Sequence, residues 1–586
     1  MKIKFALGNL SAEKEVDSGD FVLTNRLGGF FYSNPGTRYG GWFIFEGEMF
    51  KILEGFSNVV SHFENWFYQV NRKGRILEEY YLPFGENSLV YGSSGEIELV
   101  LDIRKPFDNR TWGRNYEVFI EDGKTIIKFT KKTDKREDKS DSETEFEMFV
   151  VVNAVGEKIN KWIEKEYDLD KKRNSSPVAR HVYQAVKFKP GRYVITAGLD
   201  KERVLSRHKY VVENWEILRE KQKKYFETFL EGNLTRFCAQ TALDSLINHF
   251  DGKSMWAGLP WFFQEWTRDE AISCRALMIE GEFELAKKLL LSHLDCILED
   301  GRLPNYHREK YRTEYLESAD AVGWVFLRLG ELIKLGKLDE KELKFVKSKL
   351  VLAIERLLTY RTKNKLAING VLESWMDTGP KGYQRDGACI EIQALRLAMY
   401  KLAYELTRDK KYQVMEKEMK EEVRQQFWDE EMLVDRVGDL TARPNVFLAA
   451  YAYPDLLTKE EWVIAFEYVL ERIWLGWGGL STIDFRSKLF VDEYSGENNK
   501  SYHHGDSWFW VNNIAALMML RFDRVKFKDY IAKIFTASQN ELLWSGVIGS
   551  CAELSSAKEL RSEGCELQAW SCATFIELIE ELSKKN

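Results

Sequence analysis

The sequence predicts a two-part fold, an antiparallel β-sandwich followed by an all-α region. Between residues 21 and 204 the apolar residues come in short alternating runs separated by Gly, Asn and Asp, which is typical of strands. Beyond residue 207 apolar residues recur at i, i+3 and i+4, the period of amphipathic helices. The length of 586 residues supports this division, because it exceeds what one hydrophobic core usually organises.

The β-rich part carries its own turn signal. The dipeptide Asp122-Gly123 separates two runs rich in β-branched and aromatic residues, and Asp-Gly favours the tight turn of a β-hairpin. Residues 131–145 (KKTDKREDKSDSETE) are all polar or charged, so we expect a solvated loop between two strands there. These features predict an antiparallel β-sandwich domain at residues 1–206.

The helical part begins with a long amphipathic segment at residues 210–230, which we expect to act as a linker helix within 207–231. From there to residue 586 we count ten to twelve helical segments. They alternate with loops rich in Gly, Pro, Asn and Trp, and no repeat of 33 to 47 residues indicates an open solenoid. We therefore expect the second domain, residues 232–586, to be a closed double ring of helices.

The composition excludes several classes of function. The 85 basic and 92 acidic residues give a net charge of −7 without a basic block that would follow nucleic acid. Residues 1–20 lack an apolar core of signal-peptide length, and no run of 18 apolar residues would span a membrane, so we expect a soluble, cytoplasmic protein. The seven Cys include no CxxC pair, and only one pair of the eight His is adjacent, so we expect neither a metal site nor a cofactor.

The most informative loop contains the tetrad SWMD at residues 374–377. Asp377 follows a Trp-Met pair and precedes TGPKG, a stretch that neither a helix nor a strand would tolerate. Apolar surroundings of this kind raise the pKa of a carboxyl group by desolvation, as a general acid near neutral pH requires. The alternative is an ordinary loop Asp that caps the next helix.

A second loop, residues 255–271, places three Trp before an Arg-Asp pair at the start of a helix. Arg268 and Asp269 could cap that helix, but capping does not account for the aromatic residues before them. A guanidinium that donates and a carboxylate that accepts can together clamp the vicinal hydroxyls of a sugar. The Trp residues that would form the apolar wall are Trp256, Trp261 and Trp266.

Four further positions attract attention. Glu317 and Asp320 are three residues apart and, if helical, would share one face. Residues 442–445 (ARPN) open a helix, and residues 502–508 (YHHGDSW) carry the only adjacent His pair. This pair could be a fragment of a metal site, but sugar binding or loop packing is favoured since no third ligand lies nearby in the sequence. Glu553 is a surface Glu on its own and a candidate second catalytic acid when paired with Asp377.

Taken in order, these segments resemble the motifs of the amylo-α-1,6-glucosidase family, the C-terminal half of glycogen debranching enzymes and a stand-alone protein in archaea and bacteria. Residues 260–269 resemble its "PWF…WGRD" run, 302–305 its "GLIPN" and 374–377 its "TWMD". The other similar segments are 25–30, 37–42, 385–391, 443–445, 502–505 and 553–571. Residues 503–508 (HHGDSW) differ from the bacterial form "HQGTVW" at three positions, and Ala552 replaces the residue usually found before the base.

The resemblance implies a multidomain protein with an N-terminal antiparallel β-supersandwich and an all-α (α/α)6 toroid. It implies an exo-acting hydrolase that removes α-1,6-linked glucose stubs from glycogen or a similar branched α-glucan and inverts the anomeric carbon. Asp377 would be the general acid and Glu553 the base, at the separation of about 6.5–9.5 Å typical of inverting enzymes. The substrate-binding residues that we expect are Trp256, Trp261, Trp266, Arg268, Asp269, Asp320, Trp375, Arg385, Glu391, Arg443, Asn445, His503, His504, Gln568 and Trp570.

Other activities remain open at the level of sequence. A glucoamylase or trehalase would use the same carboxyls on another linkage. A sugar phosphorylase would need only the acid, and a sugar epimerase on a helical toroid would rely on residues such as His503 and His504. A non-catalytic glycan-binding protein would bind sugar without releasing glucose.

Overall fold

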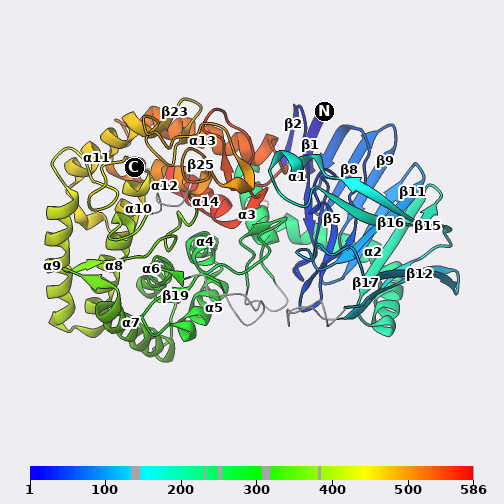
Figure 1. Cartoon of the computed structure of the whole chain (residues 1–586), viewed down its shortest axis with the longest axis horizontal. Helices are drawn as coiled ribbons and strands as arrows, with labels where there is room; N and C mark the ends of the chain where they lie inside the picture. Colours follow the sequence, from blue (N-terminus) through cyan, green and yellow to red (C-terminus); the bar gives the residue numbers. More distant parts are fainter. Residues whose placement is uncertain are drawn as a thin grey trace. The chain divides into compact units, whose positions relative to one another are not determined.

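The computed structural model describes residues 1–8, 10–133, 145–229, 233–248, 254–306, 317–379 and 385–584. The chain divides into two compact units (Figure 1). Unit 1 consists of Met1–Asp251 and Leu543–Gly549, and unit 2 of Gly252–Leu542 and Ser550–Asn586. Most of the charged loop predicted at residues 131–145 lies outside the described residues. The domain limits predicted at residues 206 and 231 stay a prediction.

Unit 1 is built around two large sheets, which appear in blue to cyan in Figure 1. The ten-stranded sheet has the order β12 (Arg114–Glu121), β13 (Lys124–Lys131), β14 (Phe146–Val152), β17 (Gly191–Gly198), β10 (Ser88–Ser93), β9 (Leu77–Tyr81), β8 (Gln69–Gly74), β7 (Val60–Asn65), β1 (Lys2–Leu7) and β2 (Leu10–Glu15). The seven-stranded sheet has the order β15 (Glu157–Glu166), β16 (Ala179–Phe188), β11 (Ile97–Arg104), β6 (Met49–Leu53), β5 (Gly41–Phe45), β4 (Phe30–Tyr32) and β3 (Val22–Thr24). The described neighbours are antiparallel, except that β1 and β7 are parallel.

The predicted hairpin is present. Glu121 of β12 pairs with Lys124 of β13 across a two-residue turn. Asp122 and Gly123 both have positive φ, 49° and 73°, as the tight hairpin turn requires. The pattern of alternating residues therefore led to the right sheet class and, at this turn, to the right register.

Aromatic side chains fill the space between the two sheets. Tyr116 of β12 stacks on Tyr183 of β16 with ring centroids 4.5 Å apart, and Phe31 of β4 packs on Tyr80 of β9 at 5.1 Å. Helix α2 (Lys201–Glu227) lies against the ten-stranded sheet, where Val211 joins a cluster of buried strand residues. The helix predicted at residues 210–230 thus begins earlier, where Asp200 accepts a hydrogen bond from the Arg203 N–H and caps the first turn.

A buried ionic cluster lies within unit 1, centred on the fully buried Asp102. Its carboxylate accepts hydrogen bonds from Arg104 Nε at 2.7 Å, Arg114 Nη2 at 2.8 Å and Arg180 Nη1 at 3.4 Å, and Lys51 Nζ is 3.8 Å away. Burial alone would raise the pKa of Asp102, but the surrounding cations hold this pKa well below its ordinary value. Burial likewise lowers the pKa of Lys51 to about 8.

A short segment from late in the chain, Leu543–Gly549, completes unit 1. Val547 forms a β-bridge with Asp20, whose N–H donates to the Gly546 carbonyl over 2.9 Å and whose carbonyl accepts from the Ile548 N–H over 2.9 Å. The ring of Trp544 packs edge-on against Phe5 at 5.5 Å. The β unit is therefore not contiguous in sequence.

Twelve α-helices follow α2 in the described residues, which agrees with the predicted ten to twelve. They are α3 (Leu234–Ser245), α4 (Thr267–Ile279), α5 (Phe283–His293), α6 (Ala321–Lys334), α7 (Glu340–Tyr360), α8 (Ile390–Thr407), α9 (Lys410–Phe427), α10 (Asn445–Ala452), α11 (Lys459–Ile473), α12 (Phe509–Asp523), α13 (Lys528–Trp544) and α14 (Ala569–Ser583).

The helices of unit 2 form a closed inner ring. Helices α4, α6, α8, α10, α12 and α14 each pack on the next, and α14 packs back on α4. In Figure 1 α7, α9 and α11 lie outside α6, α8 and α10, so the even-numbered helices form the inner layer. This arrangement confirms the double ring of helices that the alternation of helices and special loops predicted.

Burial explains which helices take the inner positions. Every residue of α12 from Phe509 to Met519 and of α14 from Ala569 to Ile579 is buried, as expected for helices covered on all sides. The outer helix α9 instead buries only Tyr412, Met419, Val423 and Phe427, which line one side. The sequence therefore encodes the two layers through the width of the apolar face.

Short strand pairs hold the loops at the beginnings of the inner helices. β18 (Gly258–Leu259) pairs with β27 (Leu567–Gln568), and β25 (Ser507–Trp508) pairs with β26 (Leu554–Ser555). β19 (Leu303–Pro304) pairs with β20 (Glu317–Ser318). The predicted common helix face for Glu317 and Asp320 is wrong, because Glu317 lies in β20 and Asp320 is the residue before α6.

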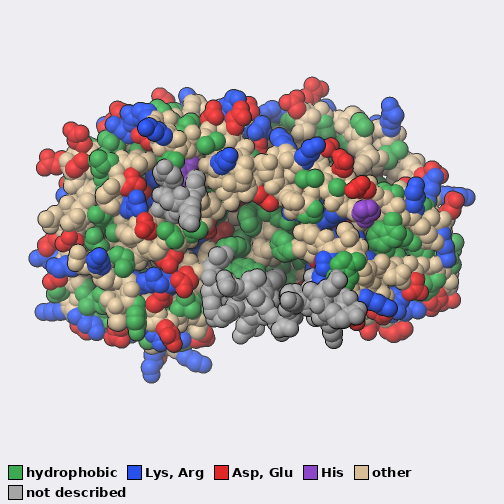
Figure 2. Space-filling view, viewed as in Figure 1, with side chains coloured by type: hydrophobic (Ala, Val, Ile, Leu, Met, Phe, Trp, Pro, Cys, Tyr) green, Lys and Arg blue, Asp and Glu red, His purple; other side chains and the backbone are tan. Residues whose placement is uncertain are grey.

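The surface of the described residues agrees with the nearly balanced composition. Figure 2 shows Lys and Arg side chains interspersed with Asp and Glu over the visible face. Among the described helices, none combines the length and the apolar character needed to cross a bilayer.

Candidate active site

The inner helices bring the predicted site residues together at their N-terminal ends. Because an outer helix leads the chain back between successive inner helices, these N-termini lie at the same end of the ring. Free backbone N–H groups and the helix dipole make such positions favourable for carboxylates. The residues are Arg268 and Asp269 (α4), Asp320 (before α6), Glu391 (α8), Asn445 (α10), His503 and His504 (the loop before α12), and Gln568 and Trp570 (α14).

Asp377 lies on the loop between α7 and α8, behind a buried Trp-Met pair. Trp375 and Met376 are 1% and 3% exposed, whereas the Asp377 side chain keeps 32% of its surface exposed. Its carboxylate is not surrounded by apolar groups alone, since Arg268 Nη1 lies 3.4 Å from Oδ2 and His503 Nε2 lies 3.6 Å from Oδ1. The apolar wall predicted beside Asp377 is thus present on one side, and polar partners occupy another.

Arg268 connects Asp377 to a second acid. Its Nε donates to both oxygens of the buried Asp320, at 2.9 and 2.8 Å, and its Nη2 donates to Ser318 Oγ at 3.3 Å. This arrangement fixes the guanidinium and aims Nη1 at Asp377. Asp320, which we expected to contact substrate, therefore holds Arg268 in place.

Asp269, the residue after Arg268, is a buried carboxyl that is neutral at pH 7. Burial raises its pKa to about 8, and the negative charges of Glu553 and Asp377 add to this although Arg268 opposes it. Gln568 Nε2 donates to Asp269 Oδ1 over 3.2 Å. At pH 7 the Asp269 carboxyl consequently carries a proton and can donate a hydrogen bond as well as accept one.

Glu553 lies between α13 and α14 and is only 2% exposed. The Tyr502 hydroxyl donates to Oε1 over 2.5 Å, and the Cys565 N–H donates to Oε2 over 2.9 Å. The preceding Gly564 has φ +70°, and a Cβ there would lie 2.4 Å from Glu553 Oε2. The carboxylate therefore sits in a fitted cradle that only glycine leaves open.

Asn445 supports the loop that carries Asp377. Its Oδ1 accepts from Trp375 Nε1 over 2.7 Å, and its Nδ2 lies 3.5 Å from Met376 Sδ. The same Nδ2 donates to Asp435 Oδ1 over 2.6 Å. Both residues that precede Asp377 are thus held by one side chain at the start of α10.

Arg385 and Glu391 form a buried cluster with Asp435. Arg385 donates two hydrogen bonds to Glu391, two to Asp435 and one to Ser374 Oγ, at distances from 2.7 to 3.2 Å. A guanidinium has five N–H groups, so all of them are used within the protein. This geometry favours a supporting role for Arg385 and Glu391 over the substrate contact that we predicted.

The two predicted His are buried and neutral. Burial lowers the pKa of His503 and lowers that of His504 to about 4. The carbonyls of His503 and Thr482 accept hydrogen bonds from Arg443 Nη1, at 3.2 and 3.0 Å. Arg443 therefore holds the backbone of the His loop.

Most of the predicted Trp side chains are packed inside the protein. Trp256 and Trp261 are 2% and 8% exposed, in the loop before α4. Trp266, which is partly exposed, precedes α4 and packs on Tyr306 at 5.5 Å. The rings of Trp375 and Trp570 both pack on Trp510, at 5.2 and 4.9 Å, and so line the inner ring. Trp266 is the one among these predicted Trp that keeps partial exposure.

Two residues with structural importance were absent from the predicted set. Tyr502 stood in a segment that we singled out for its His pair, yet only the structure shows its bond to Glu553. Asp435 lies in no recognisable motif and pairs with residues from two other loops. A buried Asp with two partners distant in sequence leaves no local signal.

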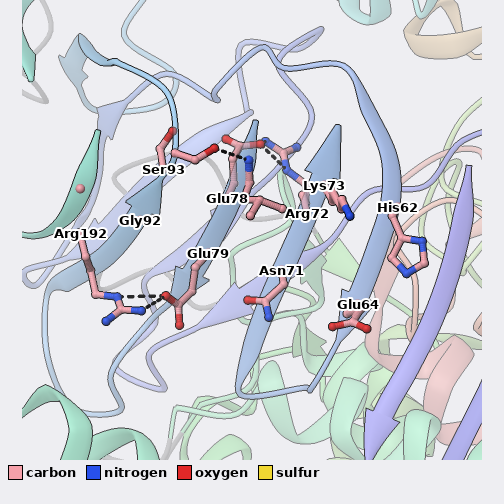
Figure 3. Close-up of a pocket in the computed structure, with 13 residues that line it drawn as sticks. His62, Glu64, Asn71, Arg72, Lys73, Glu78, Glu79, Gly92, Ser93 and Arg192 are labelled. Atoms are coloured by element: carbon pink, nitrogen blue, oxygen red, sulfur yellow. Dashed lines mark hydrogen bonds and ion pairs between the residues drawn. The ribbon is translucent and has the colours of Figure 1, made fainter. Parts of the chain in front are cut away.

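A hollow on the ten-stranded sheet of unit 1 is a separate feature (Figure 3). It has a volume of about 660 Å³, and the residues that line it include no predicted site residue. Its charged side chains pair with one another, Arg192 with Glu79 and Arg72 with Glu78. Among the described residues no group of three or more His, Cys, Asp or Glu could hold a metal ion.

The comparisons with known proteins agree with this fold. The model of the amylo-alpha-1,6-glucosidase family matches residues 236–577, more than half of the chain. A bacterial glucoamylase in complex with acarbose is similar over 99% of this chain and 94% of its own, at 11% sequence identity and a TM-score of 0.66. A GH63 mannosylglycerate hydrolase from Thermus thermophilus, in complex with Tris, is similar over 58% of this chain and 98% of its own, at 16% identity and a TM-score of 0.45.

A large antiparallel β unit and a closed (α/α)6 ring of helices define the class, and the bacterial glucoamylase shares this fold. The protein is a glycoside hydrolase. The chain belongs to the amylo-α-1,6-glucosidase family, which confirms the family resemblance seen in the sequence.

Proposed function

We propose that this protein is an exo-acting, inverting glycoside hydrolase that releases glucose from α-1,6-linked branch stubs of glycogen-like α-glucans. One observation carries the proposal. The carboxyls of Asp377 and Glu553, from loops 176 positions apart (553 − 377), both lie beside the consecutive residues Tyr502 and His503: the Tyr502 hydroxyl donates to Glu553, and His503 Nε2 is 3.6 Å from Asp377 Oδ1. Paired carboxyls in a closed ring of helices are what hydrolysis of a glycosidic bond requires.

In this proposal Asp377 is the general acid. Its side chain keeps 32% of its surface exposed and follows the buried Trp375 and Met376 in the chain, so a sugar can reach the carboxyl from solvent. A general acid in this position would donate a proton to the glycosidic oxygen as the bond breaks. Arg268 fixes the orientation of the carboxyl through Oδ2.

Glu553 is the proposed base. Donors on both of its oxygens favour the ionised carboxylate, which can then take a proton from the attacking water. Water attacks the face opposite the leaving group, so the product is the β-anomer of glucose. This mechanism requires a separation of about 6.5–9.5 Å between the two carboxyls. A retaining enzyme would instead need Glu553 as a nucleophile at about 5 Å.

Arg268 and Asp269 are the proposed binding pair for the terminal glucose. Because Asp269 is neutral at pH 7, it can donate one hydrogen bond to a sugar hydroxyl and accept another. Trp266, partly exposed beside this pair, offers an apolar face for the sugar ring. These contacts would select the non-reducing end of a glucan.

The test compares the rates of glucose release from several substrates and identifies the anomer of glucose that forms first. We expect glucose release from a glucosyl-branched dextrin and from isomaltose to exceed release from maltose and trehalose, with β-glucose as the first product by NMR. A preference for maltose would indicate a glucoamylase, and cleavage of trehalose alone would contradict the proposal.

Two rival chemistries give different products. A phosphorylase would require phosphate and release glucose 1-phosphate. An epimerase would keep its activity in Asp377→Asn and lose it in His504→Ala. We expect phosphate-independent hydrolysis that Asp377→Asn abolishes.

A further inference from the structure

We infer that Tyr502 is a positioning residue for Glu553, and that the dipeptide Tyr502–His503 places the base and the acid beside one pair of consecutive residues. The inference rests on the proposed function, since it assigns Glu553 the role of base. Its starting point is the 2.5 Å hydrogen bond from the Tyr502 hydroxyl to Glu553 Oε1. A hydrogen bond from a hydroxyl to a carboxylate is charge-assisted and is stronger than one between neutral groups.

The surroundings lock the Tyr502 side chain in place. Its ring packs edge-on against Trp508 at 4.8 Å and against His503 at 4.9 Å. Trp508 Nε1 also donates to the Tyr502 carbonyl over 2.9 Å, so backbone and side chain are held by the same indole. The hydroxyl therefore has a fixed position from which it can set the orientation of Glu553.

The second oxygen of Glu553 is held by a segment that follows Glu553 in the chain. The Cys565 N–H donates to Oε2, and Gly564 leaves no space for a side chain next to this oxygen. Because these two donors lie on different oxygens, rotation of the carboxylate about its Cγ–Cδ bond would break both hydrogen bonds. Removal of the Tyr502 hydroxyl would take away the bond to Oε1 and make that rotation easier.

The residue after Tyr502 reaches the other carboxyl. His503 Nε2 lies 3.6 Å from Asp377 Oδ1, and the His503 ring is stacked on Trp508 at 5.1 Å and packed edge-on against Trp375 at 5.3 Å. One indole, that of Trp508, thus contacts both members of the dipeptide. The dipeptide therefore brings a hydrogen-bond partner of the base next to a close neighbour of the acid.

The hydroxyl stays a donor across the working pH range. Burial and the charge of Glu553 raise the pKa of Tyr502 well above its ordinary value. Within the part of the chain that the structure describes, Asp269, Asp506 and the Cys565 thiol also interact with the charge of Glu553. Burial raises the pKa of each of these three, to about 8 for both Asp, so they stay neutral in the acid range where the base takes up its proton.

The test is Tyr502→Phe, which removes only the hydroxyl. On a branched dextrin and on α-glucosyl fluoride we expect kcat to fall roughly 10- to 100-fold with KM within about threefold, because a misoriented base costs rate and not binding. The acid limb of the kcat profile should also move to higher pH, since a carboxylate without its donor is protonated more easily. Fluoride leaves without protonation, so this substrate reports on the base and not on Asp377.

Tyr451→Phe is the matched control. The Tyr451 hydroxyl also donates to a buried carboxylate, Glu577, over 2.8 Å, but it does so away from the proposed site. We expect this variant to keep the wild-type rate and pH profile. The inference would be overturned if the acid limb of the kcat profile moved equally in both variants, or if it stayed at the wild-type pH in Tyr502→Phe.

Two further outcomes separate this inference from the proposed function. If the wild-type protein hydrolyses neither the dextrin nor the fluoride, the proposed function fails and the inference falls with it. If Tyr502→Phe does not fold, 3-fluorotyrosine at position 502 keeps the shape and makes the hydroxyl more acidic. Its stronger hydrogen bond should move the acid limb to lower pH, and an unmoved limb would equally overturn the inference.

Discussion

Two sets of buried carboxyls, one in each unit, have opposite electrostatics. In unit 1, Asp102 is surrounded by three Arg and one Lys, and its pKa lies well below the ordinary value. In unit 2, burial raises the pKa of Asp269 and of Asp506 to about 8 and that of Glu541 to about 7. A buried Asp is thus ionised in the first set and neutral at pH 7 in the second.

The difference follows from the number of cations near each group. Desolvation raises the pKa of a buried carboxyl everywhere, and only nearby positive charges or hydrogen-bond donors reverse the shift. Asp102 has such partners on both oxygens, whereas Asp269 has one Arg and the opposing charges of Glu553 and Asp377. Carboxyls matched by cations hold a fold together, and unmatched carboxyls are typical of sites where protons move.

The largest expected effect comes from removing the charges of the proposed catalytic pair. Asp377→Asn and Glu553→Gln should each lower kcat by roughly 10²- to 10⁴-fold, the usual contribution of a general acid or base. The free energy of unfolding should change by less than about 1 kcal/mol for Asp377→Asn, because its side chain is partly exposed. Glucose release and urea denaturation measure the two quantities. Retained activity in Glu553→Gln would mean that another carboxyl is the base.

Asp102→Asn tests the carboxylate of unit 1 that is surrounded by cations. Because four cations would lose a buried counter-charge, we expect the free energy of unfolding to fall by about 3–5 kcal/mol. Activity per folded molecule should stay at the wild-type value. The control is Glu147→Gln, which removes an exposed ion pair with Lys128 in the same unit and should cost less than about 1 kcal/mol. Equal losses in both variants would show that the cluster does not stabilise unit 1.

A gradual effect, spread over several pH units, is the pH dependence of stability due to Asp269. Its pKa is about 8 in the folded protein and about 3.9 in an unfolded chain, so between these values only the folded state holds the proton. Stability from this group is fully present below about pH 4 and is lost as pH rises through 8, with a slope of up to about 1.4 kcal/mol per pH unit. Asp269→Asn cannot ionise, so its unfolding free energy should decline less between pH 5 and 7.5. Parallel curves for the two proteins would contradict this assignment.

The sequence sufficed for the architecture because each layer has a clear period. Alternating residues around Asp122-Gly123 predicted the hairpin, and the width of the apolar face distinguishes α12 from α9. The start of α2 was less visible, because its cap at Asp200 lies beyond the most regular part of the amphipathic pattern. Patterns thus predict elements better than they predict where the elements begin.

The sequence predicted which residues gather at the site better than it predicted what each of them does there. Arg385 and Glu391 were expected to bind substrate, but the structure ties them to Asp435, which no motif indicates. The bond between Tyr502 and Glu553 joins residues 51 positions apart, and no local pattern encodes such a contact. Family motifs indicate which side chains gather, whereas hydrogen-bond partners depend on how the loops meet.

The segment Leu543–Gly549 has a consequence for how the protein is made. When a ribosome has synthesised residues 1–251, unit 1 still lacks the segment that bridges to Asp20 and carries Trp544. At about 5–20 residues per second, this segment follows about 15–60 s later, from the 298 residues between positions 251 and 549. Unit 1 is therefore completed only after residues 252–542 of unit 2 have been synthesised, and a fragment that stops at residue 251 leaves its Asp20 edge unpaired.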